Sequence, residues 1–160
     1  MAKAPAFSDE AITNRFKEAI ASKASGVMLD LACGPGMLLA SLASAMRLSV
    51  GVDVTPKMIQ VARATCRAAS QAPTQFAESL AECLPFATAA IDCVVTRLSI
   101  HHFLDPLVVL REVKRVLNPT VYSSSAISFH RKTQPRDGST MRWNNCVIHL
   151  TSACCPRANC

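Results

Sequence analysis

The chain has 160 residues, half of them apolar, and a formal net charge of +6. This length predicts one domain that buries its own core. No apolar run reaches the ~18 residues of a membrane span, and the N-terminus lacks the apolar segment of a secretory signal, so we expect a cytoplasmic protein. Most of the basic excess falls in residues 120–160, without interleaved aromatic side chains, and this argues against a nucleic-acid partner.

The first third of the chain predicts alternating helices and strands. Apolar residues on one face, after a capping Ser8, predict a helix over 9–22. An apolar run over 27–31 predicts a buried strand, and a turn of small residues and a helical pattern follow. A second apolar run, 48–52, ends on Asp53. The order is therefore strand, loop, helix and strand, with an acidic residue at the tip of the second strand.

The loop between these strands has the chemistry of a nucleotide-binding turn. Gly34 and Gly36 let a ligand approach the backbone closely, and the following helix offers unpaired N–H groups. Asp53 can accept both hydroxyls of a ribose, although a plain strand-end carboxylate is the alternative. The nicotinamide pattern G-x-G-x-x-G fails because Leu39 stands where its third glycine belongs. We therefore expect a different adenosine-containing cofactor.

The next elements continue the alternation. Pro56 suits the first turn of a helix that ends before Pro73. Residues 74–77 predict a short strand, and the nearly continuous apolar run 90–96 predicts a strand covered on both faces. This order is typical of an α/β protein with a parallel sheet.

A last helix begins at Asp105-Pro106 and ends at Asn118-Pro119. Its apolar stripe begins with Leu107. We assign its charged residues to the solvent side: Arg111, Glu112, Lys114 and Arg115.

The string Asp-Leu-Ala-Cys-Gly-Pro-Gly over 30–36 resembles motif I of class I S-adenosylmethionine-dependent methyltransferases. Ala32 stands where that family usually has its first glycine. Segments 51–59, 78–86 and 90–103 resemble the family's next blocks in the same order, so the resemblance covers about 30–119. It is most similar to the group that includes ubiquinone- and menaquinone-biosynthesis methyltransferases, the methyltransferase type 11 domain.

The resemblance implies an α/β three-layer sandwich around a parallel, Rossmann-like methyltransferase sheet, with its C-terminal strands incomplete. It implies S-adenosylmethionine as the cofactor. Asp30 would orient the methionine amine or only fix the glycine loop. The acid that often contacts the adenine amine falls at Leu80, so the backbone of Ala81 would serve instead. The implied cofactor contacts are Asp30, Ala32, Gly34, Gly36, Asp53, Val54, Met58, Ala81, Glu82 and Arg97.

The expected reaction is methyl transfer to a small-molecule acceptor. The sulfonium is already a good electrophile, so the protein mainly aligns the reactants. His101 or His102 would act as a base if the acceptor is a hydroxyl or an acidic carbon. The alternative is that His102 only caps or packs the loop.

The resemblance stops at Pro119, which predicts a cofactor-binding core over 1–119 and an atypical tail over 120–160. The tail predicts one strand over 121–129 and then irregular chain. Its potential zinc ligands do not match a zinc-finger spacing, so we expect no metal site. These ligands are Cys146, His149, Cys154, Cys155 and Cys160.

The change in composition at residue 119 suggests a frameshift, an alternative exon or a misjoined reading frame. A sheet without its last strands predicts self-association through its uncovered edge. The alternative to an active enzyme is a truncated, non-catalytic fold that binds the cofactor or a partner.

Overall fold

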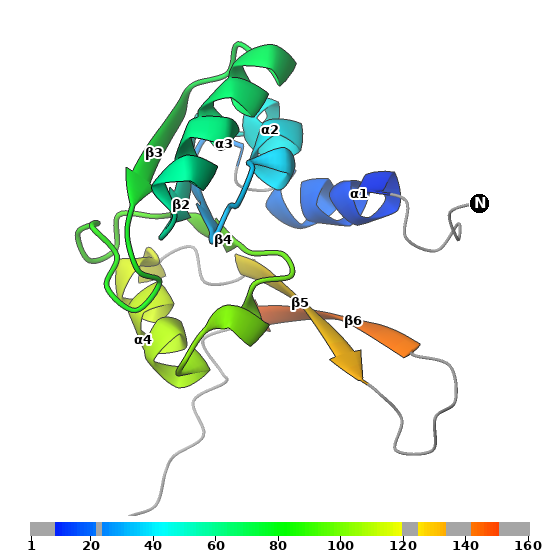
Figure 1. Cartoon of the computed structure of the whole chain (residues 1–160), viewed down its shortest axis with the longest axis vertical. Helices are drawn as coiled ribbons and strands as arrows, with labels where there is room; N and C mark the ends of the chain where they lie inside the picture. Colours follow the sequence, from blue (N-terminus) through cyan, green and yellow to red (C-terminus); the bar gives the residue numbers. More distant parts are fainter. Residues whose placement is uncertain (1–8, 22–23, 120–124, 134–141, 151–160) are drawn as a thin grey trace, which may run out of the picture.

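The chain folds around a four-stranded parallel sheet (Figure 1). The computed structural model describes residues 9–21, 24–119, 125–133 and 142–150. The strands are β1 (Val27–Leu31), β2 (Leu48–Asp53), β3 (Thr74–Glu78) and β4 (Cys93–Val95), in the order β3-β2-β1-β4. The first strand of the chain therefore lies inside the sheet, with parallel neighbours on both sides.

Helices cover both faces of this sheet because its strands are apolar on both sides. One face carries α1 (Asp9–Ile20), α2 (Met37–Leu42) with the 3₁₀ helix η3 (Ala43–Ala45), and α3 (Pro56–Ala69). The other carries α4 (Pro106–Val116). Along β1, Met28 packs on the first face, whereas Leu29 and Leu31 pack with α4. This double burial is typical of parallel sheets and confirms the predicted three-layer, Rossmann-like α/β fold.

The register of the strands brings their carboxyl ends to one edge of the sheet. β1 pairs with β2 from Val27↔Leu48 to Leu31↔Val52, and β2 pairs with β3 up to Asp53↔Glu78. The loops that follow β1, β2, β3 and β4 therefore start at the same edge. In open α/β sheets, ligands bind at this edge.

β4 is shorter than the strand predicted over 90–96. Ala89 has a positive φ of 61°, and Ile91 forms an isolated parallel bridge with Leu117 after α4. The Asp92 carboxylate accepts a hydrogen bond from the Val27 amide at 2.8 Å. The residues before Cys93 thus fasten α4 and the start of β1 instead of extending the strand.

The C-terminal part also differs from its prediction. β5 (Ser125–Thr133) and β6 (Arg142–Leu150) form a two-stranded antiparallel sheet, paired from Ser125↔Leu150 to Thr133↔Arg142. β5 lies close to β4 and α1. Residues 121–124 of the predicted strand lie outside the described residues, and β5 continues past its predicted end at 129. The expectation of irregular chain after 129 is wrong for 142–150, because backbone pairing with β5 orders that segment.

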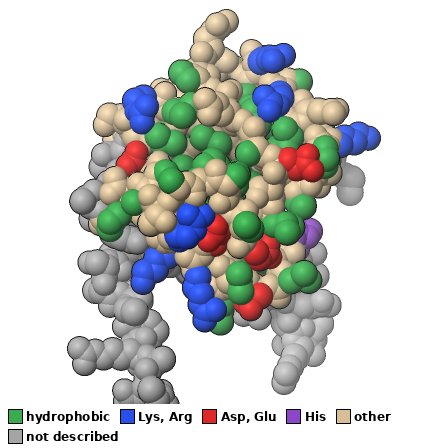
Figure 2. Space-filling view, turned by 90° about the vertical axis from the view of Figure 1, so that its left-hand side faces the viewer, with side chains coloured by type: hydrophobic (Ala, Val, Ile, Leu, Met, Phe, Trp, Pro, Cys, Tyr) green, Lys and Arg blue, Asp and Glu red, His purple; other side chains and the backbone are tan. Residues whose placement is uncertain are grey.

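Within the described parts of the chain, no helix is long and apolar enough to cross a membrane. Figure 2 shows the side of the molecule that bears β3, α3 and α4, where basic and acidic side chains are interspersed among apolar ones. Self-association and the domain boundary at 119 stay predictions. Three of the tail's candidate zinc ligands, Cys154, Cys155 and Cys160, lie outside the described residues.

Candidate cofactor site

The glycine loop after β1 is a tight turn with a left-handed backbone at three positions. The φ angles of Ala32, Gly34 and Gly36 are 56°, 52° and 77°. A Cβ added at Gly36 would lie 2.8 Å from the Ala62 Cβ on α3, whereas one at Gly34 would meet no atom within 4 Å. Gly36 is therefore required for packing against α3, and Gly34 borders open space that a ligand can occupy.

Ala32 is the only one of these three left-handed residues that is not a glycine. A left-handed backbone costs a residue with a Cβ roughly 1–2 kcal/mol. The family that the sequence resembles usually has glycine here, and the angle gives the physical reason. Ala32 adopts this left-handed backbone at the cost of local strain.

Asp53, at the end of β2, ties the glycine loop to its neighbour strand. Its Oδ2 accepts from the Gly34 amide at 2.9 Å, and its Oδ1 accepts from the Thr55 amide at 2.9 Å. Each carboxylate oxygen has two lone pairs, so each retains one acceptor position after these bonds. The strand-end role and the predicted ribose-binding role are therefore compatible. Val54, 56% exposed, and the partly buried Met58 follow directly.

Asp30 is a buried acidic residue without full hydrogen bonding. The residue is 2% exposed, and its Oδ2 has no hydrogen-bond partner among the residues that the structure describes. The pKa of Asp30 is raised to about 7, chiefly because the carboxyl group is buried; the hydrogen bond from the Leu39 backbone lowers the pKa, and the nearby Asp53 charge adds a smaller increase. A buried carboxylate oxygen without a donor favours a cationic partner. The ammonium group of a methionine-derived ligand fits this requirement.

The loop over 79–86 forms a second wall of the site. The Ser79 amide donates to the Asp53 carbonyl at 3.2 Å, which joins this loop to the tip of β2. Ala81 is buried and Glu82 is partly buried, whereas Leu80 is 56% exposed. Leu80 is apolar and cannot supply the acidic contact to an adenine amine that the resemblance implies at this position, which leaves the backbone of Ala81 as the expected substitute.

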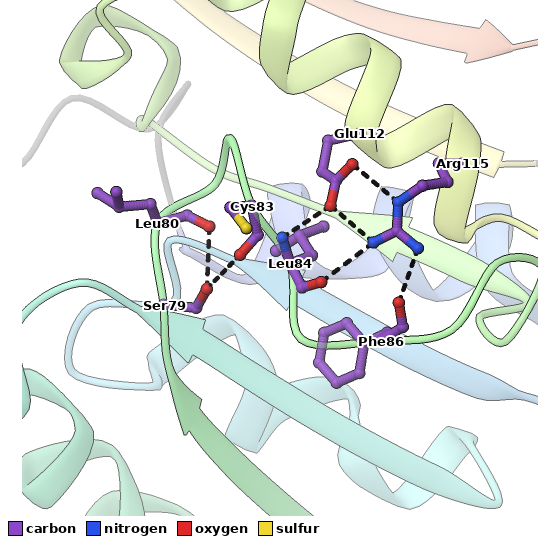
Figure 3. Close-up of polar contacts among 7 residues, drawn as sticks. All are labelled: Ser79, Leu80, Cys83, Leu84, Phe86, Glu112 and Arg115. Atoms are coloured by element: carbon purple, nitrogen blue, oxygen red, sulfur yellow. Dashed lines mark hydrogen bonds and ion pairs between the residues drawn. The ribbon is translucent and has the colours of Figure 1, made fainter.

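Two residues of α4 support this loop and correct the sequence prediction. Glu112 and Arg115 were assigned to the solvent side, but their side chains are only 16% and 35% exposed. Both bond to the loop (Figure 3). Conversely Leu107, assigned to the apolar stripe, is 63% exposed. Helical periodicity alone does not reveal these environments, because the partner loop lies about thirty residues earlier in the chain.

The end of β4 adds two buried hydroxyls that the sequence prediction missed. Thr96 Oγ1 donates to the Leu31 carbonyl at 2.7 Å, and Ser99 Oγ lies 3.4 Å from the Ala32 carbonyl. They fasten the loop after β4 to the loop after β1. The feature of the sequence that could have identified them is the position of small hydroxyl residues directly after a buried strand.

The candidate base His101 lies on the 3₁₀ helix η4 (Ile100–His102) that follows. Its side chain is exposed, and its ring centroid is 3.9 Å from that of His102. The His102 amide donates to the Ser99 carbonyl, as in a capped turn. Arg97, between β4 and this turn, is partly buried. The cofactor and base roles of these residues stay predictions.

Comparison with known proteins assigns the chain to a family. The family model for a methyltransferase domain matches residues 29–123. The chain therefore belongs to the methyltransferase domain family, and the matched region contains every residue named in the candidate site from Asp30 to His102.

Relatives and solved structures agree with this assignment. The uncharacterized methyltransferase YcgJ of Bacillus subtilis is 32% identical over 90 residues, which are 56% of this chain and 36% of YcgJ. Demethylmenaquinone methyltransferase of Lactococcus lactis is 30% identical over 95 residues, which are 58% of this chain and 38% of that protein. The chain thus spans well under half of these curated relatives.

The crystal structure of YcgJ matches with a TM-score of 0.69 and 25% identity, over 80% of this chain and 53% of YcgJ. A putative methyltransferase from Bacillus halodurans matches with a TM-score of 0.67 and 26% identity, over 81% of this chain and 53% of that protein. The computed fold is thus that of solved methyltransferase structures.

Proposed function

We propose that this chain binds S-adenosylmethionine and transfers its methyl group to a small-molecule acceptor. The observation that carries the proposal is the buried Oδ2 of Asp30, which has no hydrogen-bond partner, beside a glycine loop held by Asp53. Most buried polar atoms in proteins are hydrogen-bonded, so an unpartnered buried carboxylate oxygen supports the presence of a ligand that donates to it. The cofactor's ammonium group would supply the donor that Asp30 Oδ2 lacks, and its ribose hydroxyls would use the acceptor positions that remain on Asp53.

Different residues of the site would contact different parts of the cofactor. Asp30 would hold the ammonium group, and Asp53 would accept the ribose hydroxyls with its remaining lone pairs. The backbone at Gly34 would border the ligand, because nothing fills the space beside it. Val54 and Met58 would contact one edge of the adenine, and the loop with Ala81 and Glu82 the other.

The bound cofactor would supply an electrophilic methyl group on sulfur. The chain's part is to orient that group and exclude water, since alignment alone lowers the barrier substantially. His101, with its exposed imidazole, would take a proton from a hydroxyl or acidic-carbon acceptor. An acceptor that is already an anion or a free amine would need no such base.

The second candidate is a fold that binds the cofactor without catalysis. It is favoured by one observation: the chain spans 53% of YcgJ in the structural match. The acceptor must approach from the far side of the methyl group, and in this second candidate the wall on that side would need segments beyond those that this chain shares with YcgJ. Binding and catalysis are therefore separable in this chain.

The test has two stages. S-adenosylhomocysteine is expected to raise the melting temperature by mass action, and NAD is not. Radiolabelled S-adenosylmethionine is then incubated with a panel of hydroxyl, amine and acidic-carbon acceptors. Transfer of label supports the enzyme; stabilisation without transfer supports the binding fold. Stabilisation by NAD alone contradicts both.

A further inference from the structure

The loop over 79–86 is held differently in its two halves (Figure 3). The first half is a closed turn: Ser79 Oγ donates to the carbonyls of Leu80 at 3.2 Å and Cys83 at 2.5 Å. The Cys83 amide donates back to the Leu80 carbonyl at 3.2 Å. The second half, Leu84 to Phe86, makes its polar contacts with α4 instead.

Two side chains of α4 bind three backbone groups of that second half. Glu112 Oε1 accepts from the Leu84 amide at 2.8 Å. Arg115 donates through Nη2 to the Leu84 carbonyl at 3.1 Å and through Nη1 to the Phe86 carbonyl at 2.8 Å. The two side chains also pair with each other, Nε to Oε2 at 2.9 Å and Nη2 to Oε1 at 2.6 Å.

This pair is a rigid support and more than a surface ion pair. The forked geometry fixes both side chains, and charge-assisted hydrogen bonds are roughly twice as strong as neutral ones. The hydrogen bond from Arg115 lowers the pKa of Glu112. Val109, Val113 and Val116 anchor the helix in the core, so the pair transmits a fixed position from α4 to the loop.

The residues expected to contact the adenine lie between the two points at which the loop is attached to the rest of the fold. Ala81 and Glu82 lie after the tie from Ser79 to the Asp53 carbonyl and before the tie from Leu84 to α4. Leu80 is apolar, so the expected polar contact to the adenine amine is assigned to the backbone of Ala81. A backbone group has no rotamers, and only the loop's own position can aim it.

On the basis of the proposed function, we infer that Glu112 and Arg115 are positioning residues for adenine recognition. They hydrogen-bond to the backbone of Leu84 and Phe86, and so determine where the loop over 79–86 places its backbone relative to the adenine. Neither side chain contacts the cofactor in this assignment. Their loss changes which base the site prefers, in addition to how tightly it binds.

The test compares Arg115→Met with Arg111→Met, an exposed arginine on the same helix, as the matched control. Each protein is titrated with S-adenosylhomocysteine and with S-inosylhomocysteine, which carries an oxygen in place of the adenine amine. Arg115→Met is expected to lose affinity for the adenine compound by about 3- to 30-fold, the range for residues that act through others. Its preference over the inosine compound is expected to shrink toward one.

Hydrogen exchange supplies a readout that a general loss of stability would not reproduce. The amides of Ala81, Glu82 and Leu84 are expected to exchange faster in Arg115→Met, with those of Leu29 and Val50 unchanged. Arg115→Lys keeps the charge without the fork and is expected to rescue only part of the preference. Glu112→Gln, which keeps an acceptor for the Leu84 amide, is the milder variant if Arg115→Met does not fold.

The outcomes separate the two proposals. If the wild-type chain does not bind S-adenosylhomocysteine, the proposed function fails, and the positioning role fails with it. If the wild type binds but Arg115→Met and Glu112→Gln keep both affinity and base preference, the positioning role alone is overturned. A uniform loss for both ligands, with exchange faster throughout the sheet, also overturns it.

Discussion

The two loops that border the candidate site are held in different ways. The glycine loop is held from within the sheet, because the carboxylate of Asp53 binds the Gly34 amide one strand away. The loop over 79–86 is held from outside the sheet, by the Glu112–Arg115 pair on α4. In the proposed function, the first arrangement uses residues adjacent to the ligand, so substituting them would affect binding directly. The second would act at a distance, by positioning the loop, and would affect selectivity.

The largest effect is expected from Asp53→Ala, which removes the acceptor for the Gly34 and Thr55 amides and for the ribose. Loss of two charge-assisted hydrogen bonds, each about 1.5–3 kcal/mol, should weaken S-adenosylhomocysteine binding at least 100-fold in calorimetry. Asp105→Ala is the control: it removes the N-cap of α4 and should cost about 1 kcal/mol of stability with unchanged affinity. Equal affinities of Asp53→Ala and wild type would refute the ribose assignment.

The two glycines of the loop should separate stability from binding. In Gly36→Ala the new Cβ would meet the Cα and Cβ of Ala62 at 2.9 and 2.8 Å, so we expect a stability loss of about 2–5 kcal/mol in urea unfolding. Gly34→Ala has a similar φ but no clash, so about 1–2 kcal/mol is expected. Its Cβ enters the space assigned to the ligand, so its larger effect is on affinity. Similar stability losses in both variants would contradict this division of roles.

Asp30 should make stability and binding respond to pH in opposite directions. The folded-state pKa is raised from 3.8 to about 7, so its stability contribution is complete below pH 3.8 and is lost as the pH rises to about 7. Asp30→Asn should remove that slope, on the order of 2–3 kcal/mol between pH 5 and pH 8. Binding of the ammonium group needs the ionised carboxylate, so wild-type affinity should increase through pH 7.

Urea unfolding and ligand titration at several pH values measure both slopes of this prediction. Glu18→Gln, which changes an exposed carboxyl group on α1, serves as the control. If the stability and the affinity of Asp30→Asn change with pH as they do in the wild type, Asp30 is not the group whose titration causes the pH dependence.

The smallest effect is a stabilisation by Ala32→Gly. It relieves the roughly 1–2 kcal/mol cost of a left-handed Ala32 but adds unfolded-state entropy of about 0.4–1 kcal/mol, so a net gain of about 0.5–1 kcal/mol is expected. Ala40→Gly, inside α2, should instead destabilise by about 1 kcal/mol. Thermal unfolding of the three proteins measures both changes. A loss of stability in Ala32→Gly would show that its φ carries no strain.

The glycine loop was predictable from the sequence, whereas the way in which the loop over 79–86 is held was predictable only in part. Gly34, Gly36 and Asp53 lie within one strand–loop–helix–strand unit, where short-range pattern and turn chemistry fix the geometry. The support of the other loop comes from Glu112 and Arg115, whose partners are about thirty residues away. A charged pair three residues apart on a helix normally faces solvent, so periodicity assigned it there.

The other differences have the same origin. Ile91 and Asp92 extend an apolar run, but tertiary contacts with Leu117 and Val27 divert them from β4. β6 depends on pairing with β5, and its composition alone does not indicate a strand. Local sequence therefore predicted the parallel sheet and the glycine loop at the carboxyl end of β1, whereas long-range pairing determined the lengths and partners of the remaining elements.

The most direct test of the central claim is calorimetric titration of the wild-type chain with S-adenosylhomocysteine and, in parallel, with NAD. We expect saturable one-site binding of S-adenosylhomocysteine and no binding of NAD, because Asp30 Oδ2 is unpartnered among the described residues, the glycine loop lacks a third glycine, and Asp53 lies at the end of β2. Saturable binding of NAD, or no binding of S-adenosylhomocysteine by the folded chain, would contradict it.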